Sequence, residues 1–175
     1  MKTSAIYVYL VCLSVLVVSC KKDDISDQDR MFLNIAGSAG IMEVEMGKLA
    51  QQKGVRADVK RYGDQMVDQH TKVNEEFRAL IKRLNVEVPE TMNERNQQMV
   101  RELAALEGAA FDAKYIDTMI ADHQLATEKF QEAHDIAKNK EYKDWLARMI
   151  PVVDEHRKMA EDMKNDTTRT ASMNH

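Results

Sequence analysis

Three of the five histidines occupy positions where a helix would turn them toward its apolar side. His70 and His123 each follow a methionine by four residues, Met66 and Met119 respectively, and His156 has apolar residues on both sides. Neutral imidazole suits copper, zinc or iron, and a thioether sulfur favours Cu(I). The pattern therefore indicates a site for one transition metal, with the two methionines as soft ligands. The alternative is three polar side chains bonded to acidic neighbours inside a helical bundle.

A helix rises about 1.5 Å per residue, so spacing along the chain predicts depth in a bundle. His123 and His156 are equally far from the turn between the last two predicted helices, and His70 is similarly far from the first turn. We expect the three imidazoles to form one layer. On the first predicted helix the same height falls near Glu43, with Glu45 adjacent, so either carboxylate is a candidate additional ligand.

An internal repeat supports this layer. Segment 56–85 resembles segment 109–138 at the offset that superposes His70 on His123, and Val-Asp-Gln-His at 67–70 recurs as Val-Asp-Glu-His at 153–156. A duplicated hairpin would produce the same similarity without any metal chemistry. The matched pairs of the first alignment are Tyr62 with Tyr115, Asp64 with Asp117, Met66 with Met119, His70 with His123, Glu75 with Glu128 and Phe77 with Phe130.

The elements that would position these residues are all helical. Apolar residues at three-and-four spacing, with only two prolines and six glycines in the chain, predict long helices over 29–53, 56–85, 109–138 and 140–164. The connection 86–108 is long enough to run the length of the bundle and carries a predicted short helix over 93–106. We therefore predict an all-α, ferritin-like four-helix bundle with one long crossover, which makes the second and third long helices parallel. A simple up-down bundle is the alternative.

The N-terminus has the pattern of an export signal. Residues 1–19 are a short basic start followed by an apolar run too short to span a membrane, and Val-Val-Ser-Cys at 17–20 resembles the lipobox of bacterial lipoproteins. We expect cleavage before Cys20 and lipidation of its thiol, followed by a polar tether at 20–30. Residues 165–175 are expected to be a polar tail. The alternative is an ordinary secretory signal with an incidental cysteine.

The location that this signal implies is the cell envelope, with the lipid as the membrane contact. Lys22, Asp23 and Asp24 resemble a surface-export signal of some Gram-negative lipoproteins, although a solvated tether would have the same composition. The sequence favours the outer membrane and leaves open whether the protein faces the periplasm or the cell surface. Once Cys20 carries a lipid and Cys12 leaves with the signal, no disulfide is available.

The composition and the absence of several known motifs argue against some classes of function. A net charge of −4 argues against nucleic acid as a partner. The sequence lacks a glycine-rich phosphate loop, a nucleophile elbow and a His-Glu-x-x-His motif, so we expect no nucleotide cofactor and favour a non-enzymatic role. His134 and His175 are interpreted as solvated side chains.

Segments 37–51, 62–70, 108–123 and 150–156 resemble, in that order, a bacterial family catalogued as domain of unknown function 4142. The resemblance covers about 31–164. Members of this family are often labelled putative outer-membrane proteins, so it implies a ferritin-like fold and an envelope location. It does not imply di-iron chemistry, because ferritin-like di-iron sites use Glu-x-x-His and this chain has Val67 and Val153 three residues before two of its histidines.

Two functions fit these observations. The first is a membrane-anchored envelope lipoprotein with a non-enzymatic role in stress or interaction, in which the histidines fix helix packing. The second is an envelope protein that binds copper, zinc or iron through its core histidines. The sequence favours the first and keeps the second as its alternative.

Overall fold

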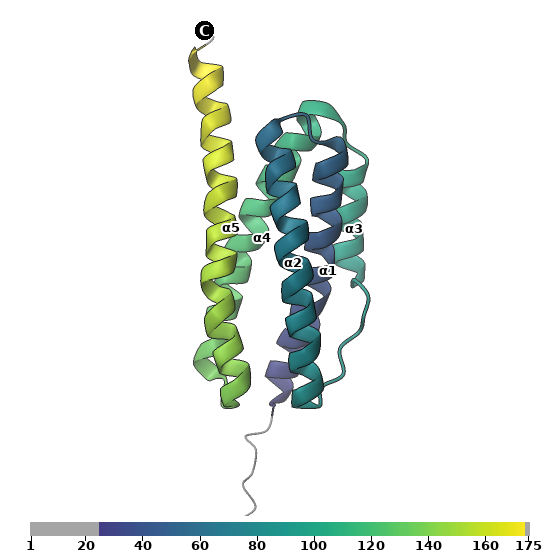
Figure 1. Ribbon diagram of the computed structural model, residues 1–175, viewed down its shortest axis with the longest axis vertical. Coiled ribbons are helices and arrows are strands. Elements are labelled where there is room, and N and C mark those ends of the chain that lie inside the picture. Colours follow the sequence, from purple (N-terminus) through teal and green to yellow (C-terminus); the bar gives the residue numbers. More distant parts are fainter. Residues whose placement is uncertain (1–24, 174–175) are drawn as a thin grey trace, which may run out of the picture.

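The computed structural model describes residues 25–173, with side chains described as far as Asp166. The predicted signal peptide and Cys20 lie outside the described residues. Every regular element is a helix in this part of the chain, as predicted (Figure 1). The helices are α1 (Asp27–Lys53), α2 (Ala57–Leu84), α3 (Glu94–Ala104), α4 (Gly108–Ile136) and α5 (Lys140–Met173).

The helices form two antiparallel hairpins, α1 with α2 and α4 with α5. After α2 the chain crosses back along the bundle and forms α3, which packs mainly against α1. In Figure 1, α2 and α4 both run downward, while α1, α3 and α5 run upward. The parallel arrangement of α2 and α4 confirms the predicted crossover and excludes the simple up-down bundle.

Both ends of the helical domain extend further than the sequence predicted. Ser26 caps α1, since its hydroxyl accepts from the Asp29 backbone N–H and the Asp29 carboxylate accepts from the Ser26 backbone N–H in return. This cap starts α1 at Asp27, inside the predicted tether. At the other end α5 continues to Met173 through the predicted tail, because its polar residues include no glycine or proline to stop a helix.

Two hydrophobic clusters fill the bundle, one above the other in the view of Figure 1. The upper core lies at the end that carries the α1–α2 turn, and the lower core at the end that carries the α4–α5 turn. The main buried residues of the upper core are Met42, Met46, Tyr62, Met66, Leu103, Phe111, Tyr115, Met119 and Met163. Those of the lower core are Leu33, Phe77, Leu80, Leu84, Tyr142, Trp145, Leu146 and Met149.

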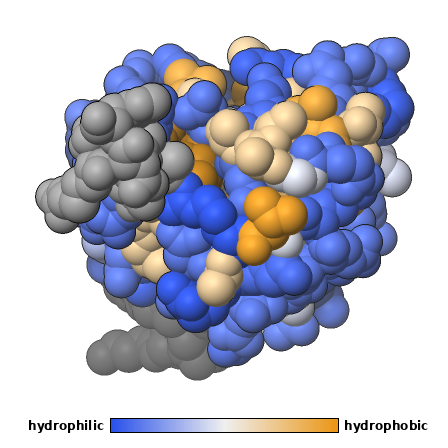
Figure 2. Space-filling view, turned by 90° about the horizontal axis from the view of Figure 1, so that it is seen from above, coloured by the Kyte–Doolittle hydropathy of each residue, from blue (hydrophilic) through white to orange (hydrophobic). Residues whose placement is uncertain are grey.

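The surface over the upper core is mainly hydrophilic, with small apolar patches (Figure 2). Val55, in the turn between α1 and α2, is the most exposed large apolar residue there, at 62%. None of the described helices combines the length and the apolar character needed to cross a membrane.

Candidate metal centre

Three buried histidines meet between the upper and lower cores. α2 contributes His70, α4 contributes His123 and α5 contributes His156, and their exposed fractions are 7%, 2% and 1%. One ring nitrogen from each lies within 4.8 Å of the others. The ring centroids are 5.1 Å apart for His70 and His156, 5.3 Å for His123 and His156, and 6.0 Å for His70 and His123. The predicted histidine layer is therefore confirmed.

Hydrogen bonds fix which nitrogens of two rings are free to bind a metal. Nδ1 of His123 lies 2.9 Å from the backbone oxygen of Met119, so this nitrogen donates and Nε2 keeps its lone pair. Nε2 of His156 is hydrogen-bonded to the side-chain oxygen of Gln69, which leaves Nδ1 as its acceptor. Outer contacts of this kind orient the rings of metal-binding histidines.

The third ring is linked to the second. Nε2 of His70 lies 3.3 Å from Nδ1 of His156, the nitrogen that has a lone pair, so His70 donates a proton across this contact. A metal ion bound between the rings would take the place of that proton. The single proton of neutral His70 would then lie on Nδ1 instead of Nε2, and each ring would offer one lone pair to the ion.

The electrostatics of the site keep these rings neutral. Burial lowers the pKa of all three histidines, and proximity to His123 and His156 lowers the pKa of His70 further. The pKa of His156 falls to about 4, from burial first and from proximity to His123 second. At neutral pH the imidazoles are therefore in the unprotonated form that coordinates metals.

Of the two candidate carboxylates, Glu43 lies beside the site without joining it. It is 3% exposed and lines a partly open cavity together with His70, His123 and Asp122. Among the described residues, the group of ligand atoms within 4.8 Å consists of the three histidines alone. Burial raises the pKa of Glu43 well above its ordinary value, and the charge and hydrogen bond of Asp122 raise it further, which favours the protonated form of Glu43.

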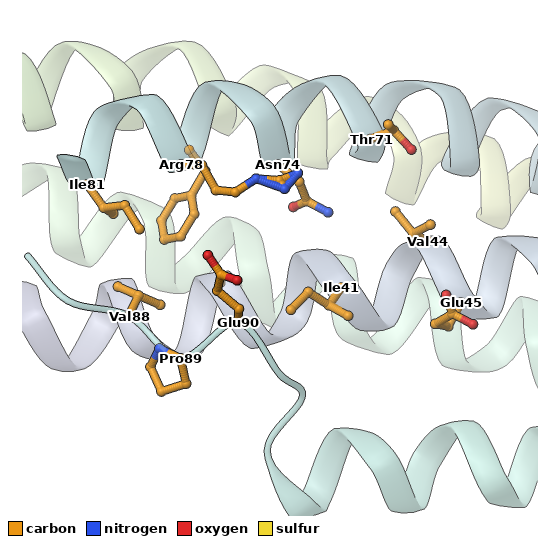
Figure 3. Close-up of a pocket in the computed structure, with 12 residues that line it drawn as sticks. Ile41, Val44, Glu45, Thr71, Asn74, Arg78, Ile81, Val88, Pro89 and Glu90 are labelled. Carbon is orange, nitrogen blue, oxygen red and sulfur yellow. The ribbon is translucent and has the colours of Figure 1, made fainter. Parts of the chain in front are cut away.

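Glu45 lies away from the histidines, in a groove between α1, α2 and the crossover segment (Figure 3). Its carboxylate accepts a hydrogen bond from Lys48 at 2.7 Å. Arg78 and Glu90 line the same groove from α2 and from the crossover. The two glutamates are two residues apart on α1, which places their side chains on different faces of that helix.

The candidate methionines lie in the upper core. Met66 and Met119 are both 0% exposed and pack among the residues of that cluster. The hydrogen bond between Met119 and the histidine layer involves its backbone oxygen, which orients His123. His134 is half-buried near the lower end of α4, with Nδ1 3.3 Å from the Asp135 carboxylate, and His175 lies outside the described residues.

Gln69 and Asp122 are functional candidates that the sequence analysis did not single out. Gln69 orients His156, and Asp122 interacts with Glu43. Each residue immediately precedes a histidine of the layer, and the repeat that superposes His70 on His123 also superposes these two positions. Their matching positions in the internal repeat are the sequence feature from which both residues could have been identified.

Comparison with known proteins agrees with the fold. No curated protein matches the chain. Among solved structures, CopM in the Cu(II)-bound form matches with a TM-score of 0.66 and 17% sequence identity, over 79% of this chain and 96% of that one. At this identity the match shows a shared fold. The model of the family described as "Domain of unknown function (DUF4142)" matches residues 18–163. The chain belongs to this family, as its sequence segments indicated.

Proposed function

We propose that this protein binds one transition-metal ion, with copper preferred, through His70, His123 and His156. The observation that carries the proposal is the convergence of three buried, neutral imidazoles within 4.8 Å of one another, drawn from three different helices. Isolated buried histidines need only one or two hydrogen-bond partners, whereas this cluster places three ligand nitrogens around one point.

The chemistry of the ligand set supports copper or zinc over magnesium or calcium. Imidazole is a borderline ligand that binds copper, zinc, nickel and iron, and Cu(II) is the most strongly held of the divalent first-row ions. The carboxylate-rich environment that hard cations need is absent from the ligand group of the described residues. The copper-bound state of CopM, which shares the fold, adds support for copper.

The first experiment measures copper binding by the purified protein. Trp145 is the single tryptophan of the chain and lines the same cavity as His70 and His123, so bound Cu(II) should quench its fluorescence. We expect one copper per chain by elemental analysis. His70→Ala, His123→Ala and His156→Ala should each lower the affinity at least tenfold. Because burial lowers the pKa of these histidines, to about 4 for His156, binding should persist below about pH 6.5, the ordinary imidazole value, and weaken as the pH approaches 4 and protons compete for imidazole.

His134→Ala is the matched control, since it removes a histidine of α4 that lies outside the layer. It should leave copper binding unchanged. If elemental analysis finds no stoichiometric copper, or if His134→Ala is as damaging as the other variants, the metal function is wrong.

A structural role of the histidines is the second candidate, in an envelope protein with a non-enzymatic role in stress or interaction. The hydrogen bonds of His70 with His156 and of His123 with Met119 favour it, because they partner the rings without a metal. Under this alternative the same His→Ala variants would destabilise the fold in the absence of copper, and added copper would not stabilise the unsubstituted protein.

For the location, the proposal is a lipid anchor at Cys20 that holds the domain at the outer membrane. The support is the sequence 17–20 and the polar segment after it. Mass spectrometry of the membrane-extracted protein should find an acylated cysteine as the first residue, and Cys20→Ala should release the protein into the soluble fraction. A Cys20→Ala variant that stays with the membrane would contradict the anchor.

A further inference from the structure

The three histidines of the layer are almost wholly buried, so a metal ion can reach them only through the interior of the bundle. A partly open cavity of about 70 Å³ borders two of them, since His70 and His123 line its wall. A single water needs about 10–15 Å³ of such volume, so the cavity has room for an ion with a few of its waters. The groups along this wall indicate how the ion enters.

The ionisable groups of this wall favour a cation. Besides the two histidines they are Glu43 of α1 and Asp122 of α4, and no lysine or arginine belongs to the described lining. Asp122 is half-buried, whereas the other three groups are buried. An ion that enters from solvent therefore meets the Asp122 carboxylate first.

Glu43 lies deeper than Asp122 in the same wall. A side-chain hydrogen bond joins the two carboxyl groups, so their oxygens lie together beside the histidines. Asp122 also directly precedes His123 on α4, and His123 keeps the lone pair of Nε2 because its Nδ1 bonds to a backbone oxygen. Carboxyl oxygens at the entrance are thus close in the fold to the imidazole nitrogens of the layer.

We propose that Asp122, paired with Glu43, is the transient oxygen ligand through which the metal ion enters and leaves the histidine site. This inference rests on the proposed metal function. The ion must give up waters before three buried imidazoles can hold it. A carboxylate oxygen can replace one of those waters on the way, because Cu(II) accepts both oxygen and nitrogen ligands. Entry exchanges one ligand of the ion for another and leaves its oxidation state unchanged.

The surface outside the cavity does not supply this attraction. Asp122 also lines a surface groove between α3 and α4, where Asp117 is the second anion and Arg95 and Lys114 are cations. These charges balance one another, so the expected effect is local to the carboxylate at the entrance. Removal of a carboxylate elsewhere on α4 should not reproduce it.

The test is the rate of Cu(II) loading, followed by Trp145 fluorescence in a stopped-flow instrument after equilibrium binding has been measured as above. Asp122→Asn keeps the shape of the side chain and one oxygen but removes the charge. It should lower the rate constant for loading at least fivefold and change the affinity less, because release to an excess of chelator slows as well. Ala126→Leu narrows the cavity at a half-buried position of α4. It should slow loading and release together at least fivefold and leave the affinity within threefold.

Asp117→Asn and Ala79→Leu are the matched controls. The first removes the same charge from an exposed position of α4, and the second adds the same side chain at an exposed position of α2. Both should load copper at the rate of the unsubstituted protein.

If Asp122→Asn or Ala126→Leu loads copper at the rate of its control, the entry route is wrong and the metal function still stands. Faster release from Asp122→Asn would identify Asp122 as a ligand of the bound ion and would contradict its transient role. Failure of copper to bind at the histidines at equilibrium would overturn both proposals, at the earlier step.

Discussion

The two cores on either side of the histidine layer differ in both composition and packing. The upper core is rich in methionine and tyrosine, and Met46, Met66 and Met119 are each 0% exposed. The lower core is built from leucine and aromatic rings, among them Phe77 and Trp145 at a centroid distance of 5.6 Å. The cavity beside the histidines borders lower-core residues such as Phe77, Trp145 and Met149, and none of its lining residues belongs to the upper core.

The contacts between the two hairpins also differ between the two ends of the bundle. At the lower end, Arg83 of α2 forms an exposed ion pair with Glu141 of α5. At the upper end, the Asp112 carboxylate of α4 accepts from the backbone N–H groups of Val55 and Arg56 at 3.1 and 2.9 Å. The Arg56 guanidinium also donates to the backbone oxygen of Met163, at 2.9 Å. The backbone oxygen of Met119, in the upper core, orients His123, whereas unfilled space borders His70 and His123 on the side of the lower core.

The largest expected effect comes from truncating a methionine in the tight core. Met46→Ala should lower the free energy of unfolding by about 2–5 kcal/mol, because the neighbouring side chains cannot collapse into the space. Met149→Ala, on the cavity side, should cost less, since Met149 is 7% exposed and already borders empty volume. Urea denaturation measures both. Equal losses would remove the packing difference on which the comparison depends.

The second-largest effect is expected from acid, which lowers the stability of the protein through the histidine layer between the two cores. The pKa of His156 is about 4 in the folded protein and ordinarily near 6.5, so the unfolded chain binds more protons between these values. The contribution of His156 to the free energy of unfolding is therefore complete above about pH 6.5, and about 3 kcal/mol of it is lost as the pH drops to 4. Denaturation of the metal-free protein against pH measures this loss. His156→Gln should flatten the profile, and His134→Gln should not.

A smaller effect is expected at the upper end of the bundle. Asp112→Ala leaves the N–H groups of Val55 and Arg56 without their acceptor, which should cost about 1–3 kcal/mol. Asp117→Ala is the control on the same helix. It removes an exposed ion pair with Lys164, for which about 0–1 kcal/mol is expected. If thermal melts show equal losses, the buried carboxylate contributes no more than a surface charge.

The long helices and their order could be predicted because the apolar spacing is regular and few residues break helices. The depth of His70, His123 and His156 followed from helix rise alone. The end of α5 was not predictable in this way, because residues 165–173 carry no apolar periodicity. Helix continuation there depends only on the absence of a stop signal.

Other parts of the site could not be predicted from the apolar periodicity, because they depend on contacts between individual side chains. The height of Glu43 was predicted, but its separation from the ligand atoms depends on side-chain packing against Asp122. Hydrogen bonds to Gln69 and to a backbone oxygen decide which ring nitrogens are free, and neither contact leaves a periodic pattern in the sequence. The cavity arises where the lower core fails to fill space, which a sequence does not record.

The division of the three ligands between the hairpins has a consequence for the order of folding. His70 belongs to the first hairpin, and His123 and His156 belong to the second. Contacts within a hairpin are local and form early, whereas docking of the hairpins must close a long stretch of chain. The complete ligand set exists only after that late step. A chain cut in the crossover would keep both hairpins intact, and it would recover the metal site only when its two fragments reassociate.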